Sequence, residues 1–184
     1  MSIEEPAYTT SQKEGLCEVR AYPSLIAAEV TVSGEREPAL RAGFNLLAGY
    51  IFGSNVQKHT VAMTAPVLQA PQSEKIAMTA PVIQQAVADG WVVRFIMPVR
   101  YTLATLPKPN NPRVRLVNLP PVRVAVIRFA GRGQAGDIEA RTEGLEIYMR
   151  HHKLNAIGPI SMARYDPPWT LWFLRRNELM VPVG

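Results

Sequence analysis

Several short stretches of the chain alternate between apolar and polar residues, which is the pattern of half-buried β-strands. Residues 17–22 and 25–32 are two such stretches, joined by a turn-forming Pro-Ser pair. In the second, every other residue from Ile26 to Val32 is apolar, so one face of this strand should be buried. The same reasoning predicts further strands at 91–98, 122–129, 160–165, 170–175 and 178–183.

Two longer stretches repeat their apolar residues every three or four positions, as one face of an α-helix does. The first predicts a helix over residues 37–52, ending near Gly53, and the second predicts a helix over residues 135–152. The apolar faces carry Leu40, Phe44, Leu47 and Ile51 in the first helix, and Ile138, Leu145, Tyr148 and Met149 in the second.

One segment occurs twice between these helices, as VAMTAPVLQ at 61–69 and as IAMTAPVIQ at 76–84, 15 positions later. Proline is poorly tolerated in a central strand because it cannot donate a ladder hydrogen bond. Pro66 and Pro81 therefore place the two copies at strand ends, edges or bulges. With the turn-like residues between them, the copies are interpreted as a hairpin-like excursion.

The two halves of the chain follow one plan, in which a strand runs to a glycine, a helix follows, and two strands complete the unit. The strand at 25–32 leads to Gly34, and the strand at 122–129 leads to Gly131, 97 positions later. Neither unit can bury a sheet face alone, so the two should pair into one curved sheet. The predicted fold class is α+β: a distorted antiparallel β-barrel of two pseudo-symmetric βαββ repeats, flanked by two α-helices.

Size and composition fit one folded domain. The chain has 184 residues, of which 47% are hydrophobic, and this is enough for one good core. We predict a single domain over residues 1–184, in which the polar residues 1–14 form a loosely held arm. Because no heptad pattern is visible, a monomer is expected.

Features of export or membrane insertion are missing from the sequence. The first residues lack the apolar segment of a signal peptide, and no apolar run approaches the ~20 residues that cross a bilayer. Cys17 is the only cysteine, so an internal disulfide cannot form. A cytoplasmic protein without a membrane partner is therefore predicted.

The chain is basic, with a net charge of +5 and a pI near 9.6. Clustered Lys and Arg would indicate binding to nucleic acid, because they release counterions from phosphates. Here the basic residues are scattered along the chain, so we expect no nucleic-acid partner. A solvated basic surface, or a site for an anionic ligand, accounts for the charge.

Side-chain catalysis has little support. The chain has no GxSxG motif, and its histidines are His59, His151 and His152. Adjacent helical residues point to different sides, so the 151–152 pair is a poor metal clamp. Cys17 lies in an alternating strand with no base nearby, which favours a small buried hydrophobe over a reactive thiol. No catalytic residue is predicted.

Large apolar side chains are concentrated near the C-terminus. If residues 170–175 form a strand, Trp169, Leu171 and Phe173 lie on one face and Trp172 and Leu174 on the other. One set can join the core. The other set, beside a Pro-rich loop, is expected to form the wall of a ligand pocket.

These residues, taken with several other motifs, resemble the SOUL haem-binding family over almost the whole chain. The motifs are EVRAYP, the helix at 38–55, MTAPV at 63–67 and 78–82, WVVRFIMP with PKPNNP, RFAG at 128–131, and ARYDPPWTLWFLRRNEL at 163–179. The resemblance implies a distorted barrel of two repeats, similar to the effector-binding domains of some bacterial transcription regulators.

The resemblance also implies a ligand, which is haem or another tetrapyrrole held in an apolar cleft between the first helix and the C-terminal segment. The cofactor-binding residues it implies are Leu40, Arg41, Phe44 and Ala48 on the helix, and Trp169, Leu171 and Trp172 opposite them. Arg41 would pair with a propionate or, alternatively, remain solvated. Phe44 and Trp169 would stack on the macrocycle.

Two positions depart from the family pattern. Ala21 stands where some members have a candidate axial histidine, and Gly49 stands where a branch of the family has a basic residue. Iron would then need another ligand, of which the candidates are His59, Met63, Met78 or a tyrosine. Otherwise packing and propionate contacts alone would hold the ligand.

Three functions remain open at this point. The first is a carrier or buffer for a tetrapyrrole, and the second is an enzyme that releases the metal from a bound tetrapyrrole. The third is a module that senses a small cationic or apolar effector. A cation would require a carboxylate in the cleft, for which Glu178 and Glu146 are the candidates.

Overall fold

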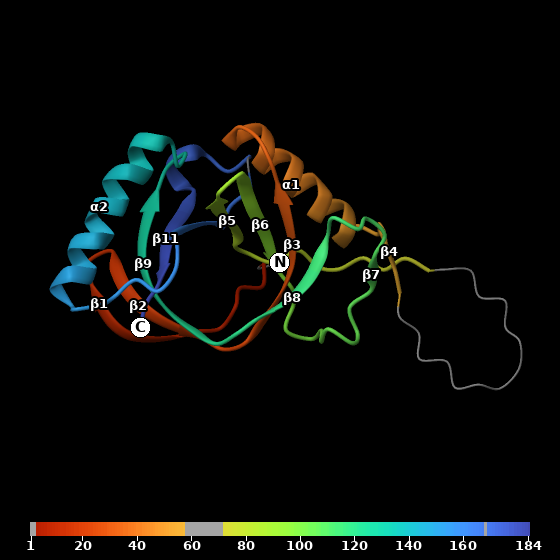
Figure 1. Ribbon diagram of the computed structural model, residues 1–184, viewed down its shortest axis with the longest axis horizontal. Coiled ribbons are helices and arrows are strands. Elements are labelled where there is room, and N and C mark those ends of the chain that lie inside the picture. The colour runs from red at the N-terminus through yellow and green to blue at the C-terminus, as the bar shows by residue number, and fades with distance from the viewer. Residues whose placement is uncertain (1–2, 58–71, 168) are drawn as a thin grey trace, which may run out of the picture.

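A computed structural model describes residues 3–57, 72–167 and 169–184. Within these residues the chain forms one nine-stranded antiparallel sheet, ordered β1-β2-β9-β11-β10-β5-β6-β3-β8, and a short two-stranded sheet, β4-β7. The large sheet arches, and the two helices lie on its outer face (Figure 1). The predicted α+β fold of two repeats and two flanking helices is confirmed, as a half-barrel whose edge strands are β1 and β8.

The helices are α1 (Arg36–Ile51), α2 (Ala135–His151) and the short 3₁₀ helix η1 (Trp172–Leu174). The strands of the first half are β1 (Thr9–Glu14), β2 (Cys17–Tyr22), β3 (Leu25–Val32), β4 (Asn55–Val56), β5 (Val82–Val87) and β6 (Gly90–Ile96). Those of the second half are β7 (Lys108–Pro109), β8 (Arg115–Leu119), β9 (Val122–Ala130), β10 (Ser161–Arg164) and β11 (Arg176–Pro182).

The strand order is symmetric about the junction of β10 and β5. On one side lie β10, β11, β9 and β2, and on the other their counterparts β5, β6, β3 and β8. One strand of each half crosses to the opposite half, because β2 pairs with β9 and β8 pairs with β3. The two repeats are therefore joined by exchanged strands as well as by the β10–β5 pair.

Each helix covers its own core. Under α1, Leu47, Tyr50 and Ile51 pack against the outward-facing residues Val30 and Val93. Under α2, a second core joins its buried residues to those of β2, β9 and β11, among them Leu145, Tyr148, Met149, Val19, Ile127 and Leu179. The apolar spacing that predicted both helices is thus the spacing of the side chains that hold them on the sheet.

Residues 9–14 do not belong to the loose arm that was predicted at residues 1–14. Thr9–Glu14 forms β1, paired antiparallel with β2, and Glu4 bridges to Thr79. All six β1 side chains are exposed. Because backbone hydrogen bonds and a few polar side-chain contacts attach this strand, no hydrophobic alternation marks it in the sequence.

Two further elements differ from expectation. Strand β8 was not predicted, and Val82–Val87 pairs with β6 and β10. The predicted hairpin between the MTAPV copies involves residues 61–69, which lie outside the described residues.

Candidate functional site

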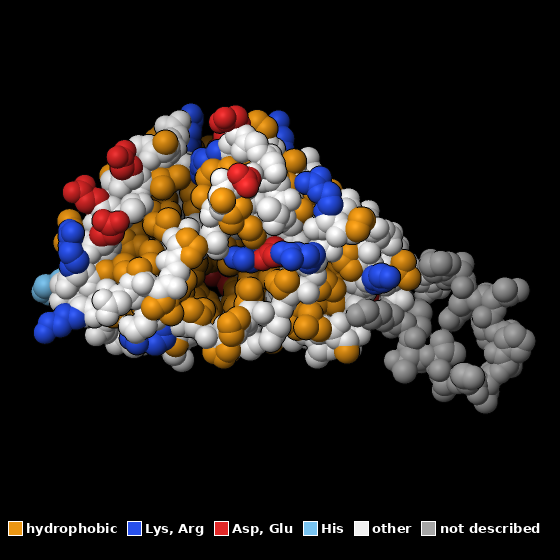
Figure 2. All heavy atoms as spheres, viewed as in Figure 1, with side chains coloured by type: hydrophobic (Ala, Val, Ile, Leu, Met, Phe, Trp, Pro, Cys, Tyr) orange, Lys and Arg blue, Asp and Glu red, His pale blue; other side chains and the backbone are white. Residues whose placement is uncertain are grey.

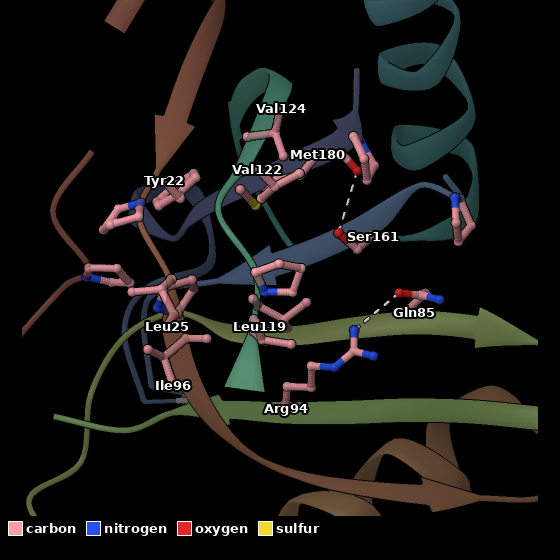
Figure 3. Close-up of a pocket in the computed structure, with 17 residues that line it drawn as sticks. Tyr22, Leu25, Gln85, Arg94, Ile96, Leu119, Val122, Val124, Ser161 and Met180 are labelled. Carbon is pink, nitrogen blue, oxygen red and sulfur yellow. Dashed lines mark hydrogen bonds between the residues drawn. The ribbon is translucent and has the colours of Figure 1, made fainter. Parts of the chain in front are cut away.

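The inner face of the sheet, turned away from the helices, encloses an apolar cavity of about 250 Å³. Because side chains alternate between the two faces of a strand, every second residue points into it. Hydrophobic side chains gather in the hollow below the two helices in the space-filling view (Figure 2). The cavity walls include Tyr22, Leu25, Ile83, Ile96, Val122 and Met180, from both repeats (Figure 3).

Arg94 is the charged residue that lines this cavity. Its Nε donates to Oε2 of Glu29 (2.5 Å), and its Nη1 donates to Oε1 of Gln85 (3.2 Å), as Figure 3 shows for Gln85. The second oxygen of Glu29 accepts from Nη2 of Arg115 at 2.6 Å. Arg94 is therefore held in place beside an apolar space, and the charge of buried Glu29 is matched by two arginines.

A second buried carboxylate lies on the same face in the other repeat. Glu178 is completely buried, and its oxygens accept hydrogen bonds from Arg20 (2.6 and 3.0 Å), Tyr165 (2.7 Å) and Arg176 (3.0 Å). Burial by itself raises the pKa of Glu178, but hydrogen bonds from Arg20 and Tyr165 and the charges of both arginines outweigh it and hold this pKa below its usual range.

These pairings decide what charge the cavity accepts. Neither Glu178 nor Glu146 lines it: Glu178 is saturated by its partners, and Glu146 is exposed on α2. Neither of the two candidate carboxylates for a cationic effector is therefore available in this cavity. An apolar or anionic molecule matches the Arg94 side better.

The helix residues implied by the family resemblance differ in exposure. Leu40 is buried in the core under α1, and Ala48 is half-buried. Phe44 is 36% exposed and contacts Phe95 edge-on, with ring centroids 5.3 Å apart. Arg41 is exposed and has no ion-pair partner among the described residues. These observations do not test whether the four helix residues line a ligand cleft, so that role stays a prediction.

The segment 169–174, called the aromatic loop here, is not the predicted strand. It is a turn followed by η1, and its backbone bonds are local: Thr170 N–H donates to Pro167 O and Leu174 N–H donates to Leu171 O. The chain leaves the sheet there, so no face of the segment joins the core. Five apolar side chains are exposed by 51–83%, namely Trp169, Leu171, Trp172, Phe173 and Leu174.

Beside the aromatic loop lies an arginine group that sequence reasoning missed, made of Arg36, Arg132 and Arg164. The guanidinium of Arg132 lies over the Trp172 ring, 5.6 Å from its centroid. Arg36, the first residue of α1, reaches the sulfur of Met162 at 3.6 Å, and Gly133, just before α2, packs against the same side chain. Both helices begin at this end of the molecule (Figure 1).

The arginine group carries unbalanced positive charge. Arg36 pairs with exposed Glu37, whereas neither Arg132 nor Arg164 has an ion-pair partner among the described residues. The Nε of Arg164 is buried and has no hydrogen-bond partner in the described part of the chain. Burial and then the charge of Arg36 lower the pKa of Arg164, so a nearby anion would stabilise this group.

Among the iron-ligand candidates, one tyrosine, Tyr22, lines the inner cavity. His59 and Met63 fall outside the described residues, and Met78 is 36% exposed.

Cys17 is buried under α2, which confirms the prediction of a small buried hydrophobe, and burial raises the pKa of its thiol.

A charge inside an otherwise apolar strand was the signal that sequence reasoning passed over. Glu29 and Arg94 each interrupt such a strand. Their partners come from other strands, so the pairs themselves are not readable from sequence.

The family comparison agrees with the repeated architecture. The model of the SOUL heme-binding protein family matches residues 3–74 and 68–182 of this chain. Two overlapping matches are consistent with a duplicated internal segment. The fold and the match together define an α+β half-barrel protein of two repeats, and the chain belongs to the SOUL heme-binding protein family.

Solved structures with the same fold are distant in sequence. The crystal structure of the EcmrR C-terminal domain has a TM-score of 0.62 and 10% identity, over 96% of this chain and 98% of that one. A hydrolase from Listeria innocua has a TM-score of 0.58 and 13% identity, over 91% of each chain. No curated protein matches this chain. None of the helices in the described part of the chain is long and apolar enough to cross a membrane.

Proposed function

We propose that this protein binds haem or a related tetrapyrrole, as a carrier or buffer, on the face formed by the aromatic loop and the arginine group. The proposal rests on one observation: five large apolar side chains are exposed beside arginines whose positive charge is unbalanced. A tetrapyrrole has flat apolar faces and carboxylate side chains, so it complements both features.

The size of the inner cavity supports placing the tetrapyrrole outside it. At about 250 Å³ it is below the roughly 300–1,000 Å³ of pockets that take drug-sized ligands. An open surface has no such limit. Exposed Trp172 could stack on a macrocycle while Arg132 stays within reach of its carboxylates.

The arginine group fits a carboxylate ligand for a physical reason. The buried Nε of Arg164 costs free energy as long as it has no partner, and Arg36 adds repulsion. Both α1 and α2 begin without a side-chain cap, so their first N–H groups add to the positive potential. A propionate would offset the unpaired Nε of Arg164, the repulsion from Arg36 and the positive potential of the helix N-termini.

Binding of this kind does not depend on a histidine at the aromatic loop. His151 and His152 lie at the C-terminal end of α2, about 25 Å along the helix from its start. Stacking and carboxylate pairing would therefore hold the ligand, with or without iron.

The test is a titration of the purified chain with haem and, separately, with metal-free protoporphyrin, followed by absorbance. We expect saturable, stoichiometric binding of both. Trp172→Ala should raise the Kd roughly three- to tenfold through lost stacking, and Arg164→Met about tenfold through a lost charge-assisted hydrogen bond. Arg41→Glu tests the helix wall in the same assay.

Matched controls are available on other surfaces. Phe52→Ala removes an aromatic side chain that is 58% exposed at the end of α1, and Arg123→Met removes an exposed arginine of β9. Both should bind like the wild type. Non-saturable binding, or equal losses in the controls, would refute the site. Loss of haem absorbance with release of free porphyrin would show turnover and favour the metal-releasing enzyme.

A second candidate function, effector binding in the inner cavity, rests on one observation. An apolar cavity contains a fixed guanidinium, Arg94, whose Nη2 has no hydrogen-bond partner among the described residues. Small apolar carboxylates would fit it. A thermal-shift screen of such acids tests this function, with Ile83→Trp to fill the cavity and Arg94→Met to remove the charge; hits unaffected by both variants would reject it.

A further inference from the structure

Three side chains with metal-binding atoms converge at the end of the molecule opposite the arginine group. Glu14 is the last residue of β1, His151 is the last residue of α2, and His152 is the cap that follows it. Oε2 of Glu14 lies 2.8 Å from Nε2 of His152 and 3.8 Å from Nδ1 of His151. One ligand atom from each residue lies within 4.8 Å of the other two.

The local geometry explains why adjacent histidines meet here. Within a helix they would point to different sides. The helix ends between them, so the rings turn toward a shared neighbour, with centroids 4.9 Å apart and planes at 84°. His152 is further held by the ring of Tyr148, 4.4 Å away. The sequence-based expectation of a poor metal clamp considered the two histidines alone, whereas β1 provides a third group beside them.

The surroundings favour a cation. The C-terminal end of α2 has a partial negative charge from its free carbonyl groups, and the carboxylate of Glu14 adds a full one. The hydroxyl of buried Tyr148 has no hydrogen-bond partner among the described residues.

The donor set selects the kind of cation. Two imidazole nitrogens and one carboxylate oxygen are ligands typical of Zn²⁺, which binds them at about 2.0–2.2 Å and takes a fourth, often water, ligand. Glu14 and His151 are 63% and 73% exposed, so their side chains can move the short distance that closes around an ion. The hydrogen bond from His152 to Glu14 would then be replaced by two bonds to metal.

We propose that Glu14, His151 and His152 form a binding site for one divalent transition-metal ion, Zn²⁺ by its donor chemistry. The site joins the β1–β2 hairpin to α2. It is independent of the proposed tetrapyrrole site, which lies at the other end of α2 (Figure 1).

Calorimetric titration of the untagged full chain with ZnCl₂, and absorbance titration with CoCl₂, test the proposal. We expect one Zn²⁺ per chain and visible Co²⁺ bands of a four-coordinate site. His152→Ala and Glu14→Gln should each raise the Kd at least tenfold. His59→Ala is the matched control, since it removes the one remaining histidine of the chain and should leave binding unchanged.

Folding of the variants is checked by thermal unfolding in EDTA, where each should keep a cooperative transition. Added Zn²⁺ should then raise the Tm of the wild type and of His59→Ala, and not that of the other two variants, because a ligand stabilises only the state that binds it. The proposal would be overturned if Zn²⁺ did not bind saturably, or if Zn²⁺ binding were lost in His59→Ala and retained in His152→Ala. In that case the group is only an ion pair at a helix end.

Discussion

At the scale of single residues, the inner face is organised by two buried glutamates that are each held by two arginines. Glu178 is paired with Arg20 and Arg176, and Glu29 with Arg94 and Arg115. Such a pair adds little net stability over apolar residues, but removing one member leaves uncompensated charge in the interior. Each glutamate therefore fixes the orientation of its arginines, which sets the charge of the cavity.

The first prediction concerns Glu178→Gln. The change leaves Arg20 and Arg176 without a counter-charge, so the free energy of unfolding at pH 7 should fall by about 3–5 kcal/mol. Urea unfolding measures this loss. Glu146→Gln on the exposed face of α2 is the control and should stay within about 0.5 kcal/mol of the wild type.

The second prediction concerns pH. Because the pKa of Glu178 is lowered on folding, its stabilisation is complete above the unfolded-state value of about 4.3 and is lost as the pH falls through the lower folded-state value. The difference in unfolding free energy between wild type and Glu178→Gln should be constant from pH 7 to 5 and shrink below about pH 4. A difference that stays constant to pH 3 would contradict this assignment.

At the scale of elements, α1 approaches the sheet through a glycine. A Cβ on Gly43 would lie 2.7 Å from Cγ2 and 3.3 Å from Cβ of Val93, which is a stiff β-branched residue of β6. Gly49, on the same helix, has nothing closer than Oγ of Ser54 at 3.7 Å. The close packing of α1 on β6 thus depends on one position, which hydrophobic periodicity does not mark.

The third prediction compares alanine at these two glycines. Gly43→Ala should destabilise the protein by about 1–3 kcal/mol, because the helix must shift from β6. Gly49→Ala should stabilise it by about 0.5–1 kcal/mol, because alanine loses less backbone entropy in a helix. Thermal or urea unfolding should show changes in the free energy of unfolding that have opposite signs in the two variants. Changes of the same sign would count against the described packing.

At the scale of the whole molecule, the two repeats cannot be separated without breaking both. One strand of each half, β2 or β8, pairs with a strand of the other half: Cys17 to Tyr22 pairs with Ile127 to Val122, and Leu25 to Glu29 pairs with Leu119 to Arg115. A half on its own would leave a strand without its partner and an apolar face open to water.

The fourth prediction follows from this exchange. Urea unfolding should be one cooperative transition, with coincident midpoints for far-ultraviolet circular dichroism and for tryptophan fluorescence. Trp91 reports on the first half, and Trp169 and Trp172 report on the second. In a Trp169→Phe, Trp172→Phe variant, the Trp91 signal should still coincide with circular dichroism; two separated transitions would show that the repeats unfold independently.

Both long helices and several strands were determined by the sequence alone. Residues 17–22 and 25–32 are β2 and β3 as predicted, and both helices begin and end within a residue or so of their predicted bounds. The reason is that the alternation of a strand and the three- to four-residue spacing of a helix are local patterns. The repeat was readable for the same reason, since both halves carry the same patterns in the same order.

Only the tertiary structure decided which residues meet. Arg20 and Glu178 are 158 positions apart, and Glu14 and His152 are 138 apart, so no local pattern relates them. The aromatic loop was mistaken for a strand because its composition is that of a strand, whereas the chain there leaves the sheet after β10 and closes local turns. The strand exchange that brings β2 to β9 forms the inner face, and with it the cavity and its charges.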